Sequence, residues 1–486
     1  MAGRLAGRVR ELDGSTVRVL DEIDALTREY APVSGPRPGV GLTPFRGIRY
    51  AGRRGSVIGN VTSPPYDMIS AGGLARLRAA DPHNVVRLIM PAEDAGAART
   101  AAGLLRQWLS DGVLIRDRVP ALYIYEQCAQ SWRQRGIIGL VRLGTPYSAG
   151  ILPHEDVMPG GVAARSRLVA ASGANLEPIF LIYDGAPGEW PARGPGTPGT
   201  PVVHGWRVPT ATEIVDRIAD GRRPLLSIKT EDGVAHRLWR LADPVSCDRI
   251  AADLACRRAL LADGHHRYAA YLRLQADMRA AGWDAGPWDY GLAFLVDSAA
   301  CPPRLSAIHR ALPGLRLDRA AGLAGRAFAV ADLPAGVCLE AALARLAEEK
   351  GTAFLLTGVA GGVNRFLLLS RPDPAQVAAA MPSGVSAPWQ RLDASILQQL
   401  LLGRLWGIED NECDVLSHHD AAEAVGAAGG GTAVILNPVP FESVRMLAEQ
   451  GERVPRKSTS FGPKPRTGLV LRAFSNKAAA RSSEFA

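Results

Sequence analysis

Apolar residues recur along the chain with two different periods, one typical of buried strands and one typical of helices. Short apolar runs predict strands at Val85–Met90, Leu122–Tyr125, Ile137–Leu143, Ile179–Tyr183, Tyr290–Val296, Thr352–Thr357, Arg365–Leu369 and Thr432–Leu436. Helical spacing predicts helices at Ala97–Leu109, Ser246–Ala262, Asp393–Leu405, Ser443–Gln450 and in the stretch after Gly264. Because the two kinds of element do not alternate regularly, we predict an α+β fold with mixed sheets and packed helices.

Changes in local composition divide the chain into five predicted segments. Residues 1–42 combine helical spacing at Val17, Leu20, Ile23 and Leu26 with a Pro/Gly-rich stretch, which predicts an N-terminal helix and a linker. Residues 43–242 form an N-terminal α+β domain that contains a Pro/Gly-rich loop at 185–201. Residues 243–330 form a unit around a Gly-His-His-Arg run, residues 331–475 form a C-terminal α+β segment that completes the site, and 476–486 form a flexible tail.

Composition narrows the classes of function. The 486 residues exceed a single core, and 47% hydrophobic residues indicate a globular protein. The net charge of +8 comes from arginines spread along the chain, without a basic run interleaved with aromatics, so we expect no nucleic-acid partner. No apolar run is long enough to span a membrane, and the N-terminus has no apolar signal core. Six scattered cysteines without a Cys-x-x-Cys pair favour reduced thiols, so we predict a cytoplasmic protein.

Lysine is scarce. Five of the 56 basic residues are lysines, at positions 229, 350, 457, 464 and 477, and the rest are arginines. An ordinary surface cation in such a chain is usually Arg. We therefore expect a lysine to be retained where a compact ammonium fits and a guanidinium does not.

The strongest local motif is Asp263-Gly264-His265-His266-Arg267, directly before a helix-forming run. Free N–H groups at a helix start favour an anion, Gly264 permits close approach, and Arg267 offers a fork to phosphate oxygens. Asp263 suits a helix cap, a cation ligand or a base. The alternative is an ordinary capped helix with surface histidines. Adjacent helical residues point about 100° apart, so we predict no metal site at the histidine pair.

A second motif, PRKSTSFGPK at 455–464, places Lys457 and Lys464 beside Ser458 and Thr459. Ammonium groups with neighbouring hydroxyls suit phosphate or carboxylate binding. The alternative is a solvated C-terminal hairpin.

Three shorter pairs are weaker candidates. His154-Glu155 follows an apolar run, and Glu155 is a candidate general base that His154 orients, against the alternative of a paired surface carboxylate. His309-Arg310 closes a strand-like run and is a candidate phosphate contact or a buried core pair. Tyr66-Asp67 lies in a proline-fixed turn. We interpret His418-His419 as a solvated helix start.

Several of these stretches resemble the bacterial and archaeal family called domain of unknown function 1015. The resemblance runs in order from about residue 43 to 472. Its stretches are SPPYDMI (63–69), His154-Glu155, NLEPIF (175–180), DGHHRYAA (263–270), Ile308-His309-Arg310 and PRKSTSFGPK (455–464). The family pattern has Thr, Lys and Asp before Arg165, where this chain has Val157, Val162 and Ala164.

The Gly264–Ala270 run is also similar to the phosphate-binding signature of the ParB/sulfiredoxin-like fold, which includes kinases of free serine. This resemblance implies a ParB/sulfiredoxin-like unit around 243–330 and a nucleotide or pyrophosphate phosphate on residues 264–267. It implies a phosphotransferase that acts on a small hydroxyl-bearing metabolite such as serine, with Mg²⁺ and ATP, ADP or pyrophosphate as donor. Lys457 and Lys464 would neutralise charge, and Glu155 or Asp263 would accept the hydroxyl proton.

Two other functions remain open at this point. One is a nucleotide-binding regulatory or interaction protein of ParB-like type. The other is a catalytically altered paralogue in a biosynthetic pathway, which the loss of three polar residues before Arg165 favours. The sequence does not indicate an oligomeric state.

Overall fold

The structure is a computed structural model that describes residues 39–52, 55–91, 96–144, 150–185, 209–360, 363–411 and 413–475. The expected N-terminal helix, the tail and nearly all of the 185–201 loop lie outside these residues. The chain forms two compact units. Unit 1 comprises residues 1–153, 157–302 and 463–486, and unit 2 comprises 154–156 and 303–462.

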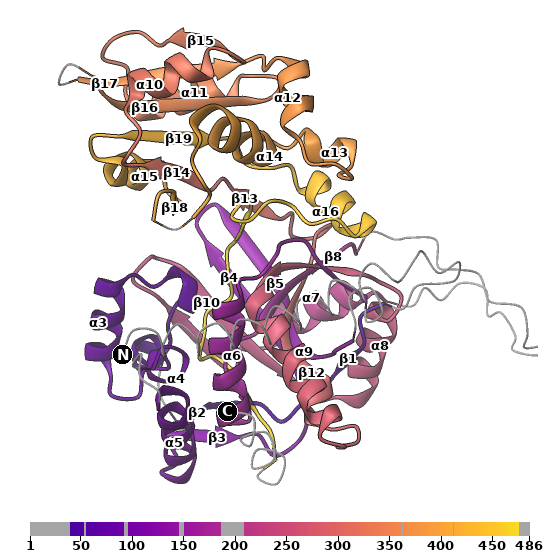
Figure 1. Cartoon of the computed structure of the whole chain (residues 1–486). Helices are drawn as coiled ribbons and strands as arrows, with labels where there is room; N and C mark the ends of the chain where they lie inside the picture. The colour runs from indigo at the N-terminus through magenta and orange to yellow at the C-terminus, as the bar shows by residue number, and fades with distance from the viewer. Residues whose placement is uncertain are drawn as a thin grey trace, which may run out of the picture. The chain divides into compact units, whose positions relative to one another are not determined.

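Unit 1 is built on a mixed nine-stranded sheet in the order β6-β11-β8-β12-β5-β4-β10-β9, with β1 paired to β5 (Figure 1). Its strands are β1 Leu42–Thr43, β4 Leu122–Ala129, β5 Trp132–Arg142, β6 Ile151–Pro153, β8 Ile179–Tyr183, β9 Leu226–Lys229, β10 Ala235–Leu241, β11 Ala259–Asp263 and β12 Tyr290–Asp297. Two short pairs accompany the sheet, β2 Ile48–Tyr50 with β3 Leu114–Arg116, and β7 Ala174–Asn175 with β21 Arg472–Ala473. The central strands β8, β11 and β12 are almost wholly buried, which explains their continuous apolar runs.

Helices complete unit 1. They are α2 Gly55–Val61, α3 Ala71–Ala80, α4 Val86–Ile89, α5 Ala97–Ser110, α6 Pro159–Ser172, α7 Ala211–Gly221, α8 Pro244–Leu254 and α9 His265–Ala280, with 3₁₀ turns η1 Tyr66–Met68 and η2 Pro287–Asp289. α6 and α9 pack side by side (Figure 1). Apolar side chains of α7, α8 and α9 join those of β5, β8, β11 and β12 in one core.

Unit 2 contains a six-stranded sheet in the order β15-β17-β16-β19-β14-β18. Its strands are β14 His309–Leu312, β15 Ala329–Asp332, β16 Ala353–Ala360, β17 Val363–Ser370, β18 Leu416–His418 and β19 Thr432–Leu436, with a separate pair of β13 Arg304–Ser306 and β20 Ser460–Gly462. Its helices are α10 Leu317–Ala324, α11 Leu339–Ala347, α12 Pro374–Ala380, α13 Ala387–Gln390, α14 Asp393–Ile396, the π-helical segment η3 Leu397–Trp406, α15 Ala421–Ala428 and α16 Phe441–Gln450.

At the centre of the unit 2 sheet, side chains on both faces are buried. Phe354 and Leu356 of β16 pack into a cluster with α10 and η3. Their neighbours Ala353 and Leu355 pack into a second cluster with α11 and α15. The period of two along β16 therefore supplies two cores, one on each face of the sheet.

The α+β prediction is confirmed, and one predicted strand is wrong. Val85–Met90 contains the helix α4, not a strand. Asn84 starts this helix, because its side-chain oxygen accepts a hydrogen bond from the Val86 N–H at 2.9 Å. The residues of α4 other than Arg87 are fully buried, so the run has the composition of a central strand. Composition alone does not separate a short buried helix from a strand.

Three helix predictions need correction. Ser246–Ala262 is split, since α8 ends at Leu254 and β11 begins at Ala259. Asp393–Leu405 is helical, but it changes from α to π geometry at Leu397. His418 ends strand β18, and α15 begins only at Ala421, with Asp420 as its N-cap.

Residues 243–330, expected to form one unit, contribute to both unit 1 and unit 2. β11 and β12 belong to the sheet of unit 1, and β14 belongs to the sheet of unit 2. A ParB/sulfiredoxin-like unit in this range stays a prediction.

None of the helices in the described ranges is both long and apolar enough to cross a membrane.

Candidate functional site

Three sequence motifs meet in unit 1 in a line of alternating charges. The Lys464 ammonium forms an ion pair with Asp67 and lies 2.6 Å from Oδ1 of Asp263. Oδ2 of Asp263 in turn pairs with the Arg267 guanidinium. We call these four residues the charge network. It joins the SPPYDMI turn, the Gly-His-His-Arg helix start and the end of the PRKSTSFGPK stretch.

The backbone around Asp263 explains its position. Asp263 ends β11, where the pairing with β8 is shifted by an irregularity between Leu261 and Asp263. Such a bulge re-aims the side chain at a strand end. Gly264 follows with φ of 92°, a left-handed conformation that glycine adopts without strain, and α9 begins at His265.

Burial and charge act against each other at Lys464. Its side chain is only 9% exposed. Burial alone would lower the pKa of the ammonium, but Asp263 and Asp67 outweigh burial and raise that pKa. At Asp67, an acid, burial alone would raise the pKa. The positive charges of Lys464 and then Arg267 outweigh burial, so the pKa of Asp67 is lowered. Both groups are therefore charged near neutral pH.

Arg267 is held inside the protein. It is 5% exposed, donates from Nη1 to the Pro178 carbonyl at 2.5 Å and pairs through Nη2 with Asp263. Its Nε is buried without a hydrogen-bond partner. The expected fork toward a phosphate is thus turned toward Asp263 and the backbone. In this arrangement Arg267 positions Asp263.

Tyr66 and Arg165 are in direct contact. The Arg165 guanidinium lies 3.7 Å from the centre of the Tyr66 ring, and the Arg267 guanidinium lies 5.9 Å from it. Arg165 also donates to the Ile89 carbonyl at 2.9 Å. Burial raises the pKa of the Tyr66 hydroxyl, against the influence of both arginines. Tyr66 is therefore neutral near pH 7.

Glu177 is a site residue that sequence reasoning missed. It is 4% exposed and accepts hydrogen bonds at Oε1 from the Tyr66 N–H and the Thr467 hydroxyl, both at 3.2 Å. Its Oε2 lies 3.9 Å from Arg165. The available signal was a lone carboxylate within the apolar NLEPIF stretch. Glu177 ties the SPPYDMI turn to the segment that follows Lys464.

The two histidines of the motif open α9. Nε2 of His266 accepts a hydrogen bond from the Met158 N–H at 3.0 Å, which places its proton on Nδ1. Gly161 of α6 lets this ring approach, because a Cβ there would lie 2.6 Å from the imidazole. His266 therefore fixes the start of α6 to the start of α9. His265 is partly buried as the first residue of α9.

A second group of predicted residues lies in unit 2. Glu155 accepts a hydrogen bond at Oε1 from the Lys457 N–H at 2.9 Å. Lys457 has φ of 54°, a strained value for a residue with a side chain. Its ammonium is exposed and has no ion-pair partner in the described part of the chain. The fully buried His154 shares a 2.8 Å hydrogen bond between Nε2 and the Thr459 hydroxyl.

The remaining predicted residues of unit 2 are buried. Ser458 and Arg310 hold the backbone of residues 455–457. The Ser458 hydroxyl donates to the Pro455 carbonyl. Arg310 is 4% exposed and donates to the carbonyls of Ile308 at 2.8 Å and Lys457 at 2.9 Å. His309, in the first position of β14, accepts from the Leu436 N–H through Nδ1 at 3.3 Å. The hydroxyls of Ser458 and Thr459 are thus both bonded within the protein.

The structure brings together the predicted residues of unit 1, namely Tyr66, Asp67, Arg165, Asp263, Gly264, His266, Arg267 and Lys464. It also brings together those of unit 2, namely His154, Glu155, His309, Arg310, Lys457, Ser458 and Thr459. Their ligand-binding and catalytic roles stay predictions. Across the described residues, no three His, Cys, Asp or Glu side chains are placed to hold a metal ion.

Comparison with known families identifies the chain. The model of the family described as "Protein of unknown function (DUF1015)" matches residues 42–191 and 200–395, more than half of the chain. The chain belongs to this family, and the resemblance seen in the sequence is confirmed. A comparison with curated proteins finds no match.

Several solved structures are distantly similar. A free serine kinase in complex with AMP shares 15% identity with a TM-score of 0.29, over 64% of this chain and 84% of that chain. SbnI with a C-terminal truncation, from Staphylococcus aureus, shares 11% identity with a TM-score of 0.31, over 72% and 95%. A conserved hypothetical protein from Pyrococcus furiosus shares 14% identity with a TM-score of 0.28, over 64% and 87%.

Proposed function

We propose that this DUF1015 protein is a phosphotransferase that moves a phosphoryl group from a nucleotide or pyrophosphate to the hydroxyl of a small metabolite such as serine. The observation that carries the proposal is the buried lysine of the charge network. Lys464, with 9% of its side chain exposed, lies between the carboxylates of Asp67 and Asp263. Phosphoryl transfer needs mainly positioning and charge stabilisation, which such a fixed ammonium supplies.

Asp67 is the group best placed to accept the substrate proton. A third of its side chain is exposed, against 11% for Asp263, which is paired with both Lys464 and Arg267. Its lowered pKa keeps it ionised at neutral pH. In the proposed step the hydroxyl proton passes to Asp67 and the hydroxyl oxygen bonds to phosphorus. The bond from phosphorus to the donor oxygen breaks, and the donor leaves with that electron pair.

The other residues of the charge network act on Asp67 or on the developing charge. Lys464 stays protonated, because two carboxylates raise the pKa of its ammonium, and it offsets negative charge that builds up on the transferring group. Asp263 and Arg267 are positioning residues, since each contacts Lys464 directly or through the other. Sequence reasoning assigned the proton transfer to Glu155 or Asp263, and the greater exposure of Asp67 is the reason for the change.

The position of Lys464 also decides whether Asp67 and Asp263 can bind the expected Mg²⁺. Lys464 already pairs with both carboxylates of the network, and no larger acidic or histidine group of metal-binding size occurs in the described ranges. These residues do not form a metal site of their own. Magnesium commonly reaches phosphoryl-transfer sites bound to the phosphates of the nucleotide, and we propose that it does so here.

Transfer is tested with the full-length protein, Mg²⁺, serine and each donor in turn, following phosphoserine by ³¹P NMR. Asp67→Asn removes the base but keeps the side-chain volume, so we expect the rate to fall about 10²–10⁴-fold. Asp248→Asn is the matched control, because Asp248 lies exposed on α8 outside the network. Glu155→Gln tests the earlier assignment in the same assay.

The outcome separates the candidate functions. Loss of transfer in Asp67→Asn with full activity in Asp248→Asn and Glu155→Gln supports the assignment of Asp67. Loss in Glu155→Gln alone returns the base to Glu155. If the wild-type protein binds nucleotides but transfers no phosphoryl group to any hydroxyl compound offered, the phosphotransferase is rejected in favour of a nucleotide-binding regulatory protein or a catalytically altered paralogue.

A further inference from the structure

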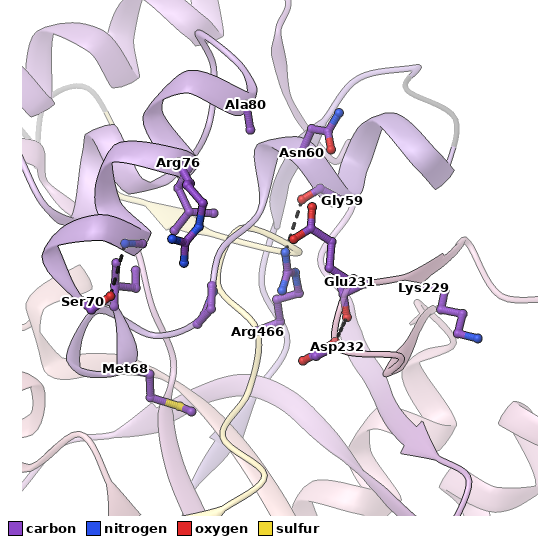
Figure 2. A pocket seen from close by; sticks show the side chains of 15 residues that line it. Gly59, Asn60, Met68, Ser70, Arg76, Ala80, Lys229, Glu231, Asp232 and Arg466 are labelled. Atoms are coloured by element: carbon purple, nitrogen blue, oxygen red, sulfur yellow. Dashed lines mark hydrogen bonds between the residues drawn. The ribbon is translucent and has the colours of Figure 1, made fainter. Parts of the chain in front are cut away.

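A groove of about 430 Å³ in unit 1 lies beside the charge network and includes none of its four residues. Figure 2 shows its walls, which come from α2, the 64–70 turn, α3, the turn between β9 and β10, and the segment at Arg466. The volume lies within the range of about 300–1,000 Å³ that small-molecule sites occupy.

The lining carries three cations, Arg76, Lys229 and Arg466, against two acids, Glu231 and Asp232, so its formal charge is +1. Arg76 is exposed on α3 and makes no hydrogen bond or ion pair with another described residue. Arg466 is part-buried and donates from Nε to the Thr62 hydroxyl at 2.7 Å and from Nη2 to the Gly59 carbonyl at 3.2 Å. Its Nη1 has no partner in the described part of the chain, and no carboxylate there lies within ion-pair distance. Figure 2 shows Arg76 and Arg466 on opposite sides of the groove.

Neither acid of the lining forms an ion pair with Arg466, so its charge is not neutralised by direct contact. Burial is the largest influence on Arg466, and it lowers the pKa of the guanidinium despite Asp232 and Glu231. Asp232 is itself engaged, since one of its oxygens accepts from the Thr230 hydroxyl at 2.5 Å. An incoming dianion would offset the charge of Arg466 more directly than either acid does.

One part of the lining is apolar. Met68 is 56% exposed, which is unusual for a large apolar side chain, and it lies in the groove with Pro64, Ile69 and Leu77. An exposed methionine is a flexible, polarisable surface for a flat apolar group. The groove thus combines a cationic region with an apolar wall.

We propose that this groove binds a phosphate ester with a flat apolar body, the chemical class that includes the nucleoside phosphates. The assignment of this groove as the binding site of the phosphate donor rests on the function proposed above. Two segments connect it to the charge network. The 64–70 turn supplies Asp67 to the network and Met68 to the groove, and the C-terminal segment supplies Lys464 to the network and Arg466 to the groove. A ligand in the groove therefore places its phosphate near residues that adjoin the reacting groups.

Calorimetric titration of the full-length protein with AMP and with inorganic phosphate tests this proposal without turnover. Arg76→Gln removes an exposed cation that holds no other part of the protein, so we expect both affinities to fall about 10–100-fold. Arg106→Gln on α5 is the matched control, because Arg106 is also an exposed helical arginine but lies outside the groove. Met68→Ser should weaken AMP several-fold and leave phosphate unchanged. Met446→Ser, at an exposed methionine on α16, is its control.

The proposal is overturned if AMP fails to bind the wild-type protein, or if Arg76→Gln binds AMP as tightly as Arg106→Gln does. Equal weakening of AMP and phosphate by Met68→Ser also contradicts the apolar half of the site. The Asp67→Asn protein should lose transfer and keep AMP affinity. If the protein transfers phosphoryl groups but Arg76→Gln leaves AMP affinity unchanged, the groove is not the AMP site, and the proposed phosphotransferase function still stands. If AMP binding depends on Arg76 but no phosphoryl transfer occurs, the groove is the AMP site and the proposed phosphotransferase function is rejected.

Discussion

At the scale of single residues, Lys464 illustrates what a compact ammonium does that a guanidinium does not. Its nitrogen contacts two carboxylates, at Asp67 and Asp263, in a space that leaves 9% of the side chain exposed. A planar guanidinium is larger and directs its donors in a fixed fork. In a chain in which only five of 56 basic residues are lysines, this space explains why a lysine stands at 464.

Lys464→Arg should therefore be harmful although it conserves charge. We expect a loss of about 1–3 kcal/mol of unfolding free energy, because the larger group is forced into a filled space. Lys464→Met should lose more, about 3–5 kcal/mol, because it leaves the buried Asp263 and the partly exposed Asp67 without their common cation. Urea denaturation measures both. Lys350→Arg, at an exposed lysine, is the control and should change nothing; an equal effect at both positions would refute the argument.

The sequence indicated the chemical types in the charge network better than their arrangement. Rare lysines and the Gly-His-His-Arg start drew attention to Lys464 and Asp263, whose Nζ and Oδ1 atoms lie 2.6 Å apart. Local sequence did not reveal that Arg267 turns inward, because its partner carbonyl belongs to Pro178, 89 positions away. Likewise Glu177 receives hydrogen bonds from Tyr66 and Thr467, which are remote in sequence. Burial of a charge depends on such distant partners, so a motif alone does not predict it.

At the scale of elements, α9 is bounded by two glycines in left-handed conformation. Gly264 precedes it with φ of 92°, and Gly282 follows it with φ of 80°. Their surroundings differ. A Cβ at Gly264 would lie 3.1 Å from both Arg267 Nε and Ile179 Cγ2, whereas a Cβ at Gly282 would meet nothing within 4 Å.

The two glycines make a matched pair for mutation. Gly282→Ala should cost about 1–2 kcal/mol of stability, which is the backbone penalty for a left-handed alanine. Gly264→Ala should cost more, because the added methyl group also presses on Arg267 and displaces Asp263. Chemical denaturation of the two variants gives the difference. Equal losses would show that the space around Gly264 relaxes freely and that the start of α9 is not rigid.

Elements were predictable where the pattern was long or where a single period dominated. β8 and β19 occupy the predicted ranges, and α5 differs by one residue. The errors occurred where a polar side chain or a distant strand decides the outcome. Asn84 converts an apolar run into α4 through its bond to Val86, and pairing with β6 and β8 draws the end of a predicted helix into β11.

At the scale of the whole molecule, each unit contains a buried histidine whose pKa is lowered. His236 in unit 1 and His309 in unit 2 are 4% and 7% exposed. Burial is the main cause that lowers the pKa of each to about 4, from the ordinary 6.5. In unit 2 the half-buried Asp393 has its pKa raised to about 6, mainly by loss of solvation, and so responds to acid in the opposite sense.

The unfolded chain binds protons at these histidines near pH 6.5, while the folded chain binds them only near pH 4. Stability from this source is complete above pH 6.5 and is lost as the pH falls toward 4. For His236 we expect a loss of about 2 kcal/mol between pH 7.5 and pH 5. Urea denaturation at the two pH values should show a smaller loss in His236→Gln than in the wild type. Unit 2 should lose less, because Asp393 opposes His309; identical pH dependence in variant and wild type would contradict this account.

The interruption of unit 1 by unit 2 has a consequence for the order in which the charges meet during synthesis. Asp67 and Asp263 leave the ribosome early, but Lys464 follows only after the whole of residues 303–462. Until then the nascent chain holds two carboxylates that lack their common cation and repel each other wherever the sheet brings them close. Unit 2, whose strands all lie within 303–462, can fold in the meantime. Charge neutrality of the network is thus acquired late. A chain that stops before residue 464 has Arg267 to pair with Asp263 but no cation for Asp67, and quality-control proteases can recognise it through the instability that follows.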